Sequence, residues 1–384
     1  MKVVFFGEEF KKAVDRVLAA ASKKSYLSIL YCVRVEAKEN HLTVSTTDSE
    51  GFATVSIDAD VLEPGVNYIT DDDIKKIYNL TGDVTLESVF ETNTNKVTVC
   101  NSKKKSSVVI TLYTDEDYLF PENPDKEVAV TTEKTLLSAM SDVAPYLSDN
   151  DANKTMTGYS FESKENRIVA LDGHRIGIKN LPDFFTSDCS VVVPGKAYAH
   201  LKKIANAKSD NEVRIYASKK YIKFVGSDFV YSSRLIDAEY YKVDNMLNAA
   251  YDCEFSMGAK EMGTLAKEYK KSLKANDKLP MLLAYNHDNN TMHSGIATSS
   301  YITSDLVEDL KIHSGMNRDL TYAFNPAFIV DAMQLFNDDV MCKCVQGGTI
   351  QKSPIVFYDD TYTVLILPVN ADLNMVDKFK KFVA

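Results

Sequence analysis

The sequence predicts an α+β protein made of three similar domains, each with two helices packed on antiparallel sheets. The first observation is an internal repeat: a strand followed by a helix start recurs about every 120 to 130 residues. The three copies occupy residues 66–74, 190–197 and 320–328. The second observation is an amphipathic helix that precedes each copy by about 60 residues. The third is a set of alternating or β-branched runs, typical of strands, at residues 41–46, 96–100, 213–217, 221–225 and 361–367.

Each domain opens with a helix whose apolar residues recur at helical spacing and form one face that can be buried. In the first helix these residues are Phe10, Ala13, Val14, Val17, Leu18 and Ala21. In the second they are Leu136, Leu137, Met140, Val143 and Ala144, and Pro145 ends the helix. In the third, which we predict over residues 260–274, they are Met262, Leu265, Ala266, Tyr269 and Leu273.

The second helix of each domain has its own start signal or apolar face. Thr70 is expected to cap the first of these helices, with Asp73 three residues later, as in a capping box. Asn325 is expected to cap the last one, residues 326–336, with Pro326 in its first turn, where the missing N–H costs nothing. The middle one follows Pro194, and its inward face consists of Ala197, Leu201, Ile204 and Ala205.

Length and composition place the chain among globular proteins. A chain of 384 residues exceeds what one core usually holds, so several domains are expected. No apolar run approaches the roughly 18 residues that a membrane span needs. The start becomes acidic at Glu8, too early for a signal peptide, so we expect a cytoplasmic protein that does not enter a membrane.

Polar or irregular segments at residues 121–126 and 243–251 mark the joints between domains. The predicted division follows from these joints. It gives domains at residues 1–123, 124–247 and 248–370, followed by a C-terminal tail at residues 371–384.

The six cysteines are scattered, and only Cys342 and Cys344 lie close together. Their spacing within a predicted strand puts both side chains on the same face. A metal site would need further ligands at a matching spacing, and the sequence offers none. We therefore expect buried, reduced thiols and no bound metal or cofactor.

The net charge is −10, yet basic residues gather on the predicted helices, whereas many acidic residues lie in strands and loops. On the third opening helix, Lys260, Lys267, Lys271 and Lys274 fall on one exposed stripe. Solvated surface would explain a lysine stripe on any single helix. Repetition across domains favours a shared basic surface for a polyanion, incomplete on the last helix, which carries Asp331 and no lysine. The candidates for such a DNA-facing surface are Lys11, Lys12, Arg16, Lys23, Lys24, Lys75, Lys76, Lys134, Lys196, Lys202, Lys203, Lys267, Lys271 and Lys274.

Residues 169–178 join two strand-like runs through an Asp172-Gly173 pair, which predicts a tight hairpin because glycine accepts the positive φ of such a turn. An enzyme that uses Asp172, His174 and Arg175 is the alternative interpretation. No nucleophile, metal ligand or oxyanion loop accompanies these residues, so the structural interpretation is favoured.

This segment resembles the Asp-Gly-His-Arg hairpin in the middle domain of bacterial DNA polymerase III beta subunits, the sliding clamps. Three further stretches are similar to that family in order and spacing, at residues 191–196, 232–237 and 365–369. The resemblance covers nearly the whole chain. It implies three clamp-type domains and a head-to-tail homodimer that forms a six-domain ring around double-stranded DNA without reading its sequence. It also implies a processivity factor without a catalytic site.

The resemblance further implies a cleft between the second and third domains, where DNA polymerase and clamp-loader subunits dock short peptides. An apolar floor with a few hydrogen-bonding groups suits such a cleft. Ring opening would need a separate ATP-driven loader, because the chain has no Gly-rich phosphate loop. A diverged, non-ring scaffold is a second alternative. The expected cleft residues are Met156, Leu171, Gly173, His174, Arg175, Ile176, Asn325, Phe328, Ser353, Leu367, Pro368 and Val369.

Three stretches depart from the family pattern. Asn248 stands where many members have a proline, and residues 347–353 are unusual, so one wall of the cleft is expected to differ. The chain also continues past the closing strand, with apolar residues at helical spacing. A frayed tail is one interpretation of this continuation. The hypothesis here is a short helix near the cleft that competes with partner peptides, and its apolar residues are Leu373, Val376, Phe379, Phe382 and Val383.

Overall fold

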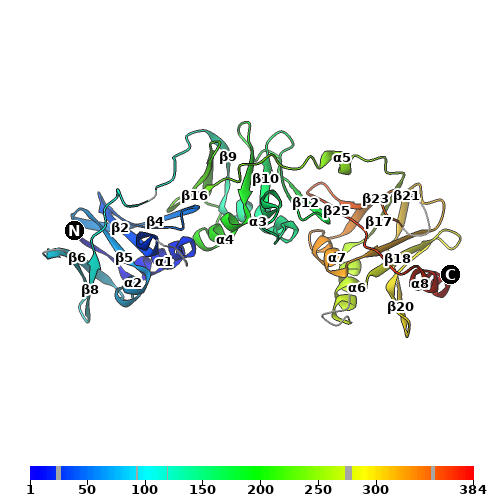
Figure 1. Cartoon of the computed structure of the whole chain (residues 1–384), viewed down its shortest axis with the longest axis horizontal. Coiled ribbons are helices and arrows are strands. Elements are labelled where there is room, and N and C mark those ends of the chain that lie inside the picture. Colours follow the sequence, from blue (N-terminus) through cyan, green and yellow to red (C-terminus); the bar gives the residue numbers. More distant parts are fainter. Residues whose placement is uncertain (23–26, 92–93, 119, 273–278, 347–350) are drawn as a thin grey trace. The chain divides into compact units, whose positions relative to one another are not determined.

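The structure is a computed structural model of the chain, and it describes all residues except 23–26, 92–93, 119, 273–278 and 347–350 (Figure 1). Contacts divide the described chain into two compact units. Unit 1 comprises Met1–Ser141 and Asp183–Ala238, and unit 2 comprises Asp142–Pro182 and Glu239–Ala384. Residues of the predicted middle domain occur in both units, and the division into three domains remains a prediction.

Unit 1 is built on one large antiparallel sheet, in the order β8-β7-β6-β1-β4-β16-β15-β14-β9, with β2 beside β3 and β5 and with β3 also beside β4. Pairing of β4 with β16, from Val55↔Phe229 to Gly51↔Ser233, joins strands of the first predicted domain to strands of the second. The strands of unit 1 are β1 (Lys2–Phe6), β2 (Cys32–Lys38), β3 (His41–Thr47), β4 (Gly51–Glu63), β5 (Gly65–Thr70), β6 (Asp83–Glu91), β7 (Thr94–Cys100), β8 (Lys105–Thr111), β9 (Glu127–Thr132), β13 (Ser190–Pro194), β14 (Glu212–Ala217), β15 (Tyr221–Val225) and β16 (Phe229–Arg234).

The helices of unit 1 are α1 (Gly7–Val17), α2 (Asp71–Ile77), most of α3 (Glu133–Val143) and α4 (Gly195–Ile204). The α1 helix buries Phe10, Ala13, Val14 and Val17 against β3 and β4, as its apolar spacing predicts. The C-terminal ends of α1 and α4 meet, where Arg16 donates to the Ile204 carbonyl (Figure 1). Their polar faces therefore belong to neighbouring surfaces of the same unit.

Unit 2 contains two antiparallel sheets. In one, the strands follow the order β10-β11-β12-β25-β24-β23-β17-β21, and the other has the order β20-β19-β18-β22. Its strands are β10 (Gly158–Glu162), β11 (Arg167–Leu171), β12 (Arg175–Asn180), β17 (Cys253–Gly258), β18 (Met281–Asn286), β19 (Thr291–Ala297), β20 (Ile302–Leu306), β21 (Lys311–Ser314), β22 (Leu320–Phe324), β23 (Asp339–Cys344), β24 (Ile355–Tyr358) and β25 (Tyr362–Ile366).

The helices that lie wholly in unit 2 are α5 (Asp244–Leu247), α6 (Ala259–Ser272), α7 (Pro326–Met333) and α8 (Leu373–Val383). The helices α6 and α7 pack side by side (Figure 1). The C-terminal α8 lies on β19 and β20, where Val376 and Phe379 are fully buried. These two side chains join Leu282, Ala284, Ala297 and Ala323 in one apolar cluster. The tail is therefore an ordered helix that covers one face of the four-stranded sheet, and the prediction of a helix is confirmed.

Most predicted signals lie where the sequence places them. The Thr70 side chain accepts the Asp73 N–H at 3.2 Å, and the Asn325 side chain accepts the Ala327 N–H at 3.0 Å, so both caps form. Cys342 and Cys344 are both buried on one face of β23, as the strand period predicts. Among the described residues, no helix is long and apolar enough to cross a bilayer.

Two predicted helix ends are wrong. The first helix stops at Val17 rather than continuing through Ala21, because the Thr46 hydroxyl donates to the Val17 carbonyl, and residues 18–20 tighten into a 3₁₀ turn. The last helix of the third repeat ends at Met333 instead of residue 336, where Leu335 N–H bonds to the Ala332 carbonyl three residues back.

The burial of α8 predicts that Phe379→Ala lowers the free energy of unfolding by about 3–5 kcal/mol, the usual cost of emptying a phenylalanine site in a core. Chemical unfolding monitored by circular dichroism measures this change. Phe382→Ala on the same helix is the matched control, because Phe382 is 60% exposed. Equal stability of the two variants would contradict the packing of α8 on the sheet.

Candidate functional site

The Asp-Gly-His-Arg motif forms the turn between β11 and β12. Gly173 has φ +87°, a backbone conformation that side-chain-bearing residues rarely adopt. One Asp172 carboxylate oxygen accepts the backbone N–H groups of His174 at 2.9 Å and Arg175 at 3.0 Å. The other accepts Arg175 Nε–H at 2.8 Å. The aspartate therefore holds the turn closed and orients the arginine.

A pocket of about 200 Å³ lies beside this turn. Its walls come from four segments of unit 2: the 3₁₀ turn at residues 154–157, the β11–β12 hairpin, the end of β25, and residues 241–246 around α5. Most of its lining side chains are aliphatic, as a site for an apolar side chain of a ligand requires. The lining residues are Met156, Leu171, Gly173, His174, Arg175, Ile176, Tyr241, Lys242, Val243, Met246, Leu365 and Leu367.

Arg175 ties the hairpin to its surroundings. Its guanidinium donates to Asp331 of α7 at 2.6 Å and to the Pro145 carbonyl at 2.6 Å. It also lies over the Phe328 ring, 4.3 Å from the ring centroid. Burial alone would lower the pKa of Arg175, but hydrogen bonds to the two carboxylates raise it above its ordinary value. The guanidinium therefore makes structural contacts that hold α7 beside the hairpin.

Seven of the predicted cleft residues line this pocket, and five do not. The pocket includes Met156, Leu171, Gly173, His174, Arg175, Ile176 and Leu367. Of the other five, Asn325 caps α7, Phe328 stacks beside Arg175 and His174, and the Ser353 hydroxyl donates to the Val345 carbonyl at 3.4 Å. Val369 packs with the α8 cluster, and Pro368 lies outside the lining.

Five lining residues were missed by sequence reasoning: Tyr241, Lys242, Val243, Met246 and Leu365. Two of them, Val243 and Met246, lie in the segment at residues 243–251 that was predicted only as a joint between domains, and Tyr241 and Lys242 directly precede it. The signal that could have found them is the apolar pair Val243 and Leu247, which is buried against the hairpin strands. None of the residues of α8, all of which the structure describes, lines the pocket. The hypothesis that the tail competes with peptides thus has no contact to support it.

The predicted basic residues fall into two groups. Those without an ion-pair partner among the described residues are Lys12, Lys134, Lys202, Lys203, Lys267 and Lys271, and all six are exposed. Five others are paired with carboxylates: Lys11 with Asp15, Lys75 with Asp71, Lys76 with Asp73, Lys196 with Asp48 and Arg16 with Asp228. Lys23, Lys24 and Lys274 lie outside the described residues.

Arg16 has a structural role that the sequence did not indicate. Its guanidinium forms a bidentate pair with Asp228, at 2.6 and 2.9 Å, and Nε–H donates to the Ile204 carbonyl at 2.7 Å. These bonds connect α1 with the end of α4 and with the turn before β16. Because the neighbouring Asp228 carboxylate would repel a phosphate, Arg16 serves first to join these elements.

Residues 130–242 match the family model described as the central domain of the DNA polymerase III beta subunit. The beta sliding clamp of Staphylococcus epidermidis is 23% identical over 379 residues, which cover 94% of this chain and 97% of that protein. The crystal structure of a putative DNA polymerase III beta subunit from Eubacterium rectale is 27% identical, covers 96% of this chain and 99% of that one, and has a TM-score of 0.83.

The chain is similar to DNA polymerase III beta subunits over nearly its whole length, and residues 130–242 match the central domain of that subunit. A further solved structure, the Pseudomonas aeruginosa sliding clamp bound to griselimycin, shares the fold with a TM-score of 0.82 at 17% identity and covers 97% of this chain and 100% of that one. Members of the family are processivity factors rather than enzymes. This agrees with the position of Asp172, whose carboxylate oxygens accept hydrogen bonds from the hairpin backbone and from the Arg175 side chain.

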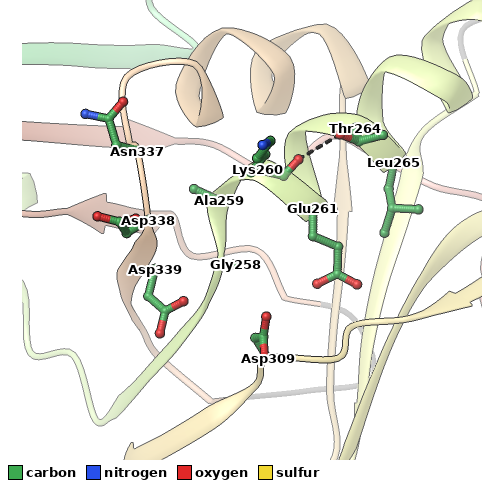
Figure 2. A pocket seen from close by; sticks show the side chains of 10 residues that line it. All are labelled: Gly258, Ala259, Lys260, Glu261, Thr264, Leu265, Asp309, Asn337, Asp338 and Asp339. Carbon is green, nitrogen blue, oxygen red and sulfur yellow. Dashed lines mark hydrogen bonds between the residues drawn. The ribbon is translucent and has the colours of Figure 1, made fainter.

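An acidic recess lies at the start of α6 (Figure 2). Glu261 and Asp309 point toward the same space beside Gly258, and Asp338 and Asp339 also line it. Carboxylates here would repel a phosphodiester backbone, so Lys260 is a poor candidate for DNA contact. One Glu261 oxygen is buried without a hydrogen-bond partner in the described chain, and burial raises the pKa of this carboxyl.

The raised pKa of Glu261 predicts a pH-dependent effect of Glu261→Gln. The folded state binds the proton more tightly than the unfolded state, so wild-type stability falls as the pH rises from 4.5 through the raised pKa. At pH 7 the variant should therefore melt about 2 °C above wild type, and below pH 4.5 the difference should shrink. Thermal unfolding at both pH values measures this, with exposed Glu268→Gln on α6 as the control. A difference independent of pH would contradict the assignment.

Proposed function

We propose that this chain is a DNA sliding clamp that closes with a second copy into a ring, encircles duplex DNA and tethers a DNA polymerase during replication. It would act in the cytoplasm and catalyse no reaction. The observation that carries this proposal is the clamp fold over the whole chain. A ring holds its polymerase by topology, so its contacts with DNA can be weak and exchange rapidly.

The exposed lysines support contact with DNA. Lys12 on α1 and Lys202 and Lys203 on α4 belong to helices in contact with each other, and Lys267 and Lys271 extend from α6. Lysine on a flexible stem neutralises phosphates without reading bases, which suits a protein that must slide. Because the chain as a whole has a net charge of −10, we expect attraction for DNA phosphates only at these lysine-bearing helices. Residues Lys11, Lys75, Lys76 and Lys196 would contribute less, because carboxylates already neutralise them.

Two sheet edges support closure of the ring by a head-to-tail contact. Among the described strands, β8 pairs only with β7, and β20 pairs only with β19. Both edges expose apolar side chains: Val109 on β8 is 60% exposed and Leu306 on β20 is 48% exposed. An open edge with apolar side chains is a template for pairing with another chain. We propose that β8 of one copy pairs with β20 of the next, and that two such contacts close the ring.

The pocket beside the β11–β12 turn is the proposed docking site for short peptides of polymerase and clamp-loader subunits. Its volume of about 200 Å³ and its aliphatic lining suit one or two apolar side chains. Phe328 and Asn325, which lie just outside it, would extend the site along a bound peptide. Since griselimycin is bound in the Pseudomonas aeruginosa clamp structure, we also propose this pocket as its site in the present protein.

The ring proposal predicts that the protein is trapped on circular DNA. A linear plasmid is closed by DNA ligase in the presence of the protein and then gel-filtered in about 1 M salt, which screens phosphate contacts. Wild type should elute with the circle and leave it after a restriction cut. Val109→Asp should disrupt the β8 edge, give the mass of one 42.9 kDa chain in light scattering, and abolish retention.

Leu62→Asp is the control for this experiment, because Leu62 is similarly exposed on β4 of the same unit. Wild type that washes off circles as readily as off linear DNA would reject the sliding clamp. A single-chain mass for the wild type would favour the diverged scaffold instead.

The docking proposal predicts that Leu367→Asp weakens griselimycin binding at least about tenfold, because a carboxylate in the pocket loses water when the ligand enters. Isothermal titration calorimetry measures the affinity. Leu373→Asp on α8 is the control, since this residue is 57% exposed and does not line the pocket. Equal affinities for wild type and Leu367→Asp would place the ligand elsewhere.

A further inference from the structure

The short helix α5 forms one wall of the pocket, yet it has little stability of its own. Val243 and Met246, together with Tyr241 and Lys242 just before the helix, line the cavity. A helix of four residues is too short to persist in water without tertiary contacts. Its N-cap residue, Val243, has no polar side chain that could cap the helix. The position of this wall therefore depends on the contacts that α5 makes with the rest of unit 2.

Apolar contacts bring α5 to the hairpin strands. Val243 and Leu247 are buried in a cluster with Leu171 and Ile178 of the hairpin and Leu365 of β25. Burial of this kind is favourable but has no preferred direction. It keeps α5 on the strands without determining how far the Val243 and Met246 side chains reach into the cavity.

The directional contact is an ion pair between Asp244, the first residue of α5, and Arg167, the first residue of β11. The two terminal nitrogens of Arg167 donate to the two carboxylate oxygens of Asp244 at 2.8 and 3.0 Å. The third donor, Nε–H, bonds to Glu162 of β10 at 2.7 Å, and Glu162 accepts the Ser160 hydroxyl at 2.7 Å. Arg167 is only 8% exposed, so its guanidinium is oriented by the strands before it meets Asp244.

From this geometry we propose that Arg167 and Asp244 are positioning residues of the docking pocket, because their ion pair fixes the rotation of α5 and thus the wall formed by Val243 and Met246. The proposal rests on the proposed docking function of the pocket. Neither residue lines the cavity, so both act through α5. A wall held in place before binding spares the ligand the cost of ordering it.

The electrostatics agree with a pair that is intact at neutral pH. Hydrogen bonds from Arg167 lower the pKa of Asp244 below its ordinary value, so the carboxylate stays charged as the pH falls toward that value. Half of the Asp244 side chain is exposed, and water screens the pair on that side. The expected effect of breaking it is therefore moderate, and Asp244 can be changed without leaving an unpaired charge in a closed core.

The test compares Asp244→Asn with wild type, using griselimycin as the probe and surface plasmon resonance to separate the two rate constants. Asp244→Asn should bind about fivefold more weakly, mainly through faster dissociation, because the wall must be ordered in each complex. In the unliganded protein, amide hydrogens of Leu247 and Asn248, which bond to the carbonyls of Val243 and Asp244, should exchange faster. Asp244→Glu, which keeps the carboxylate, should recover part of both effects.

Glu239→Gln is the matched control. Glu239 is 85% exposed in the same segment and pairs loosely with Lys242 at 3.9 Å, so its loss removes the same charge without touching Arg167. Melting temperatures within about 2 °C of wild type would show that the variants fold.

The outcomes separate the two proposals. Wild-type affinity and unchanged amide exchange in Asp244→Asn would overturn the positioning role while leaving the docking function intact. A wild type that does not bind griselimycin would count against the docking pocket, and the exchange rates in the unliganded protein would then decide whether the ion pair positions α5. Equal losses in Asp244→Asn and Glu239→Gln would mean that net charge, rather than the pair, is responsible.

Discussion

Antiparallel pairing between β12 and β25 is the contact on which the pocket depends. The register from Arg175↔Ile366 to Lys179↔Tyr362 joins the Asp-Gly-His-Arg hairpin to a strand near the other end of the chain. The register of this antiparallel ladder is strongly specified, because a shift by one residue would turn every side chain to the other face. Ile176 and Leu365 therefore meet opposite each other, and both line the cavity. The β4–β16 ladder plays the same joining role in unit 1.

Two buried guanidinium groups link the paired strands of unit 2 to nearby helices. Arg175 binds Asp172 within the hairpin and Asp331 on α7, whereas Arg167 binds Glu162 within the strands and Asp244 on α5. Each arginine thus has one partner in its own hairpin sheet and one on a neighbouring helix, α7 for Arg175 and α5 for Arg167. A guanidinium has five donors in a rigid plane, so it can hold two carboxylates at once in a defined direction. The apolar cluster around Leu171 also holds Val243 and Leu247, and the Arg167–Asp244 ion pair adds a directional contact to this apolar packing of α5.

The basic side chains on the helices differ in whether a nearby carboxylate neutralises them. The helices α1, α4 and α6 keep lysines exposed, but several basic side chains on α1 and α2, such as Lys11 and Lys75, are paired with carboxylates one helical turn away. Such pairs contribute little to stability, yet they lower the local positive charge. This restraint suits the proposed sliding function, because strong phosphate neutralisation would slow motion along DNA. Arg16 is used instead to join α1, α4 and the turn before β16.

Local features of the fold could be predicted from the sequence alone. The repeat, the apolar faces of α1 and α6, the Thr70 and Asn325 caps and the Gly173 turn all arise from residues close together in the chain, and periodicity reports such contacts directly. The tail was also recognisable as a helix from the spacing of Val376 and Phe379. Resemblance to the clamp family added most of the hairpin side of the pocket, including Leu171 and His174. Only the tertiary structure decided that α8 covers the β18–β19 face, that Val243 and Met246 complete the pocket, and that Arg16 and Arg175 have carboxylate partners more than a hundred residues away. Spacing along the chain carries no information about such contacts, since they are set by strand pairing between distant segments and by which charged groups that pairing brings within hydrogen-bond distance.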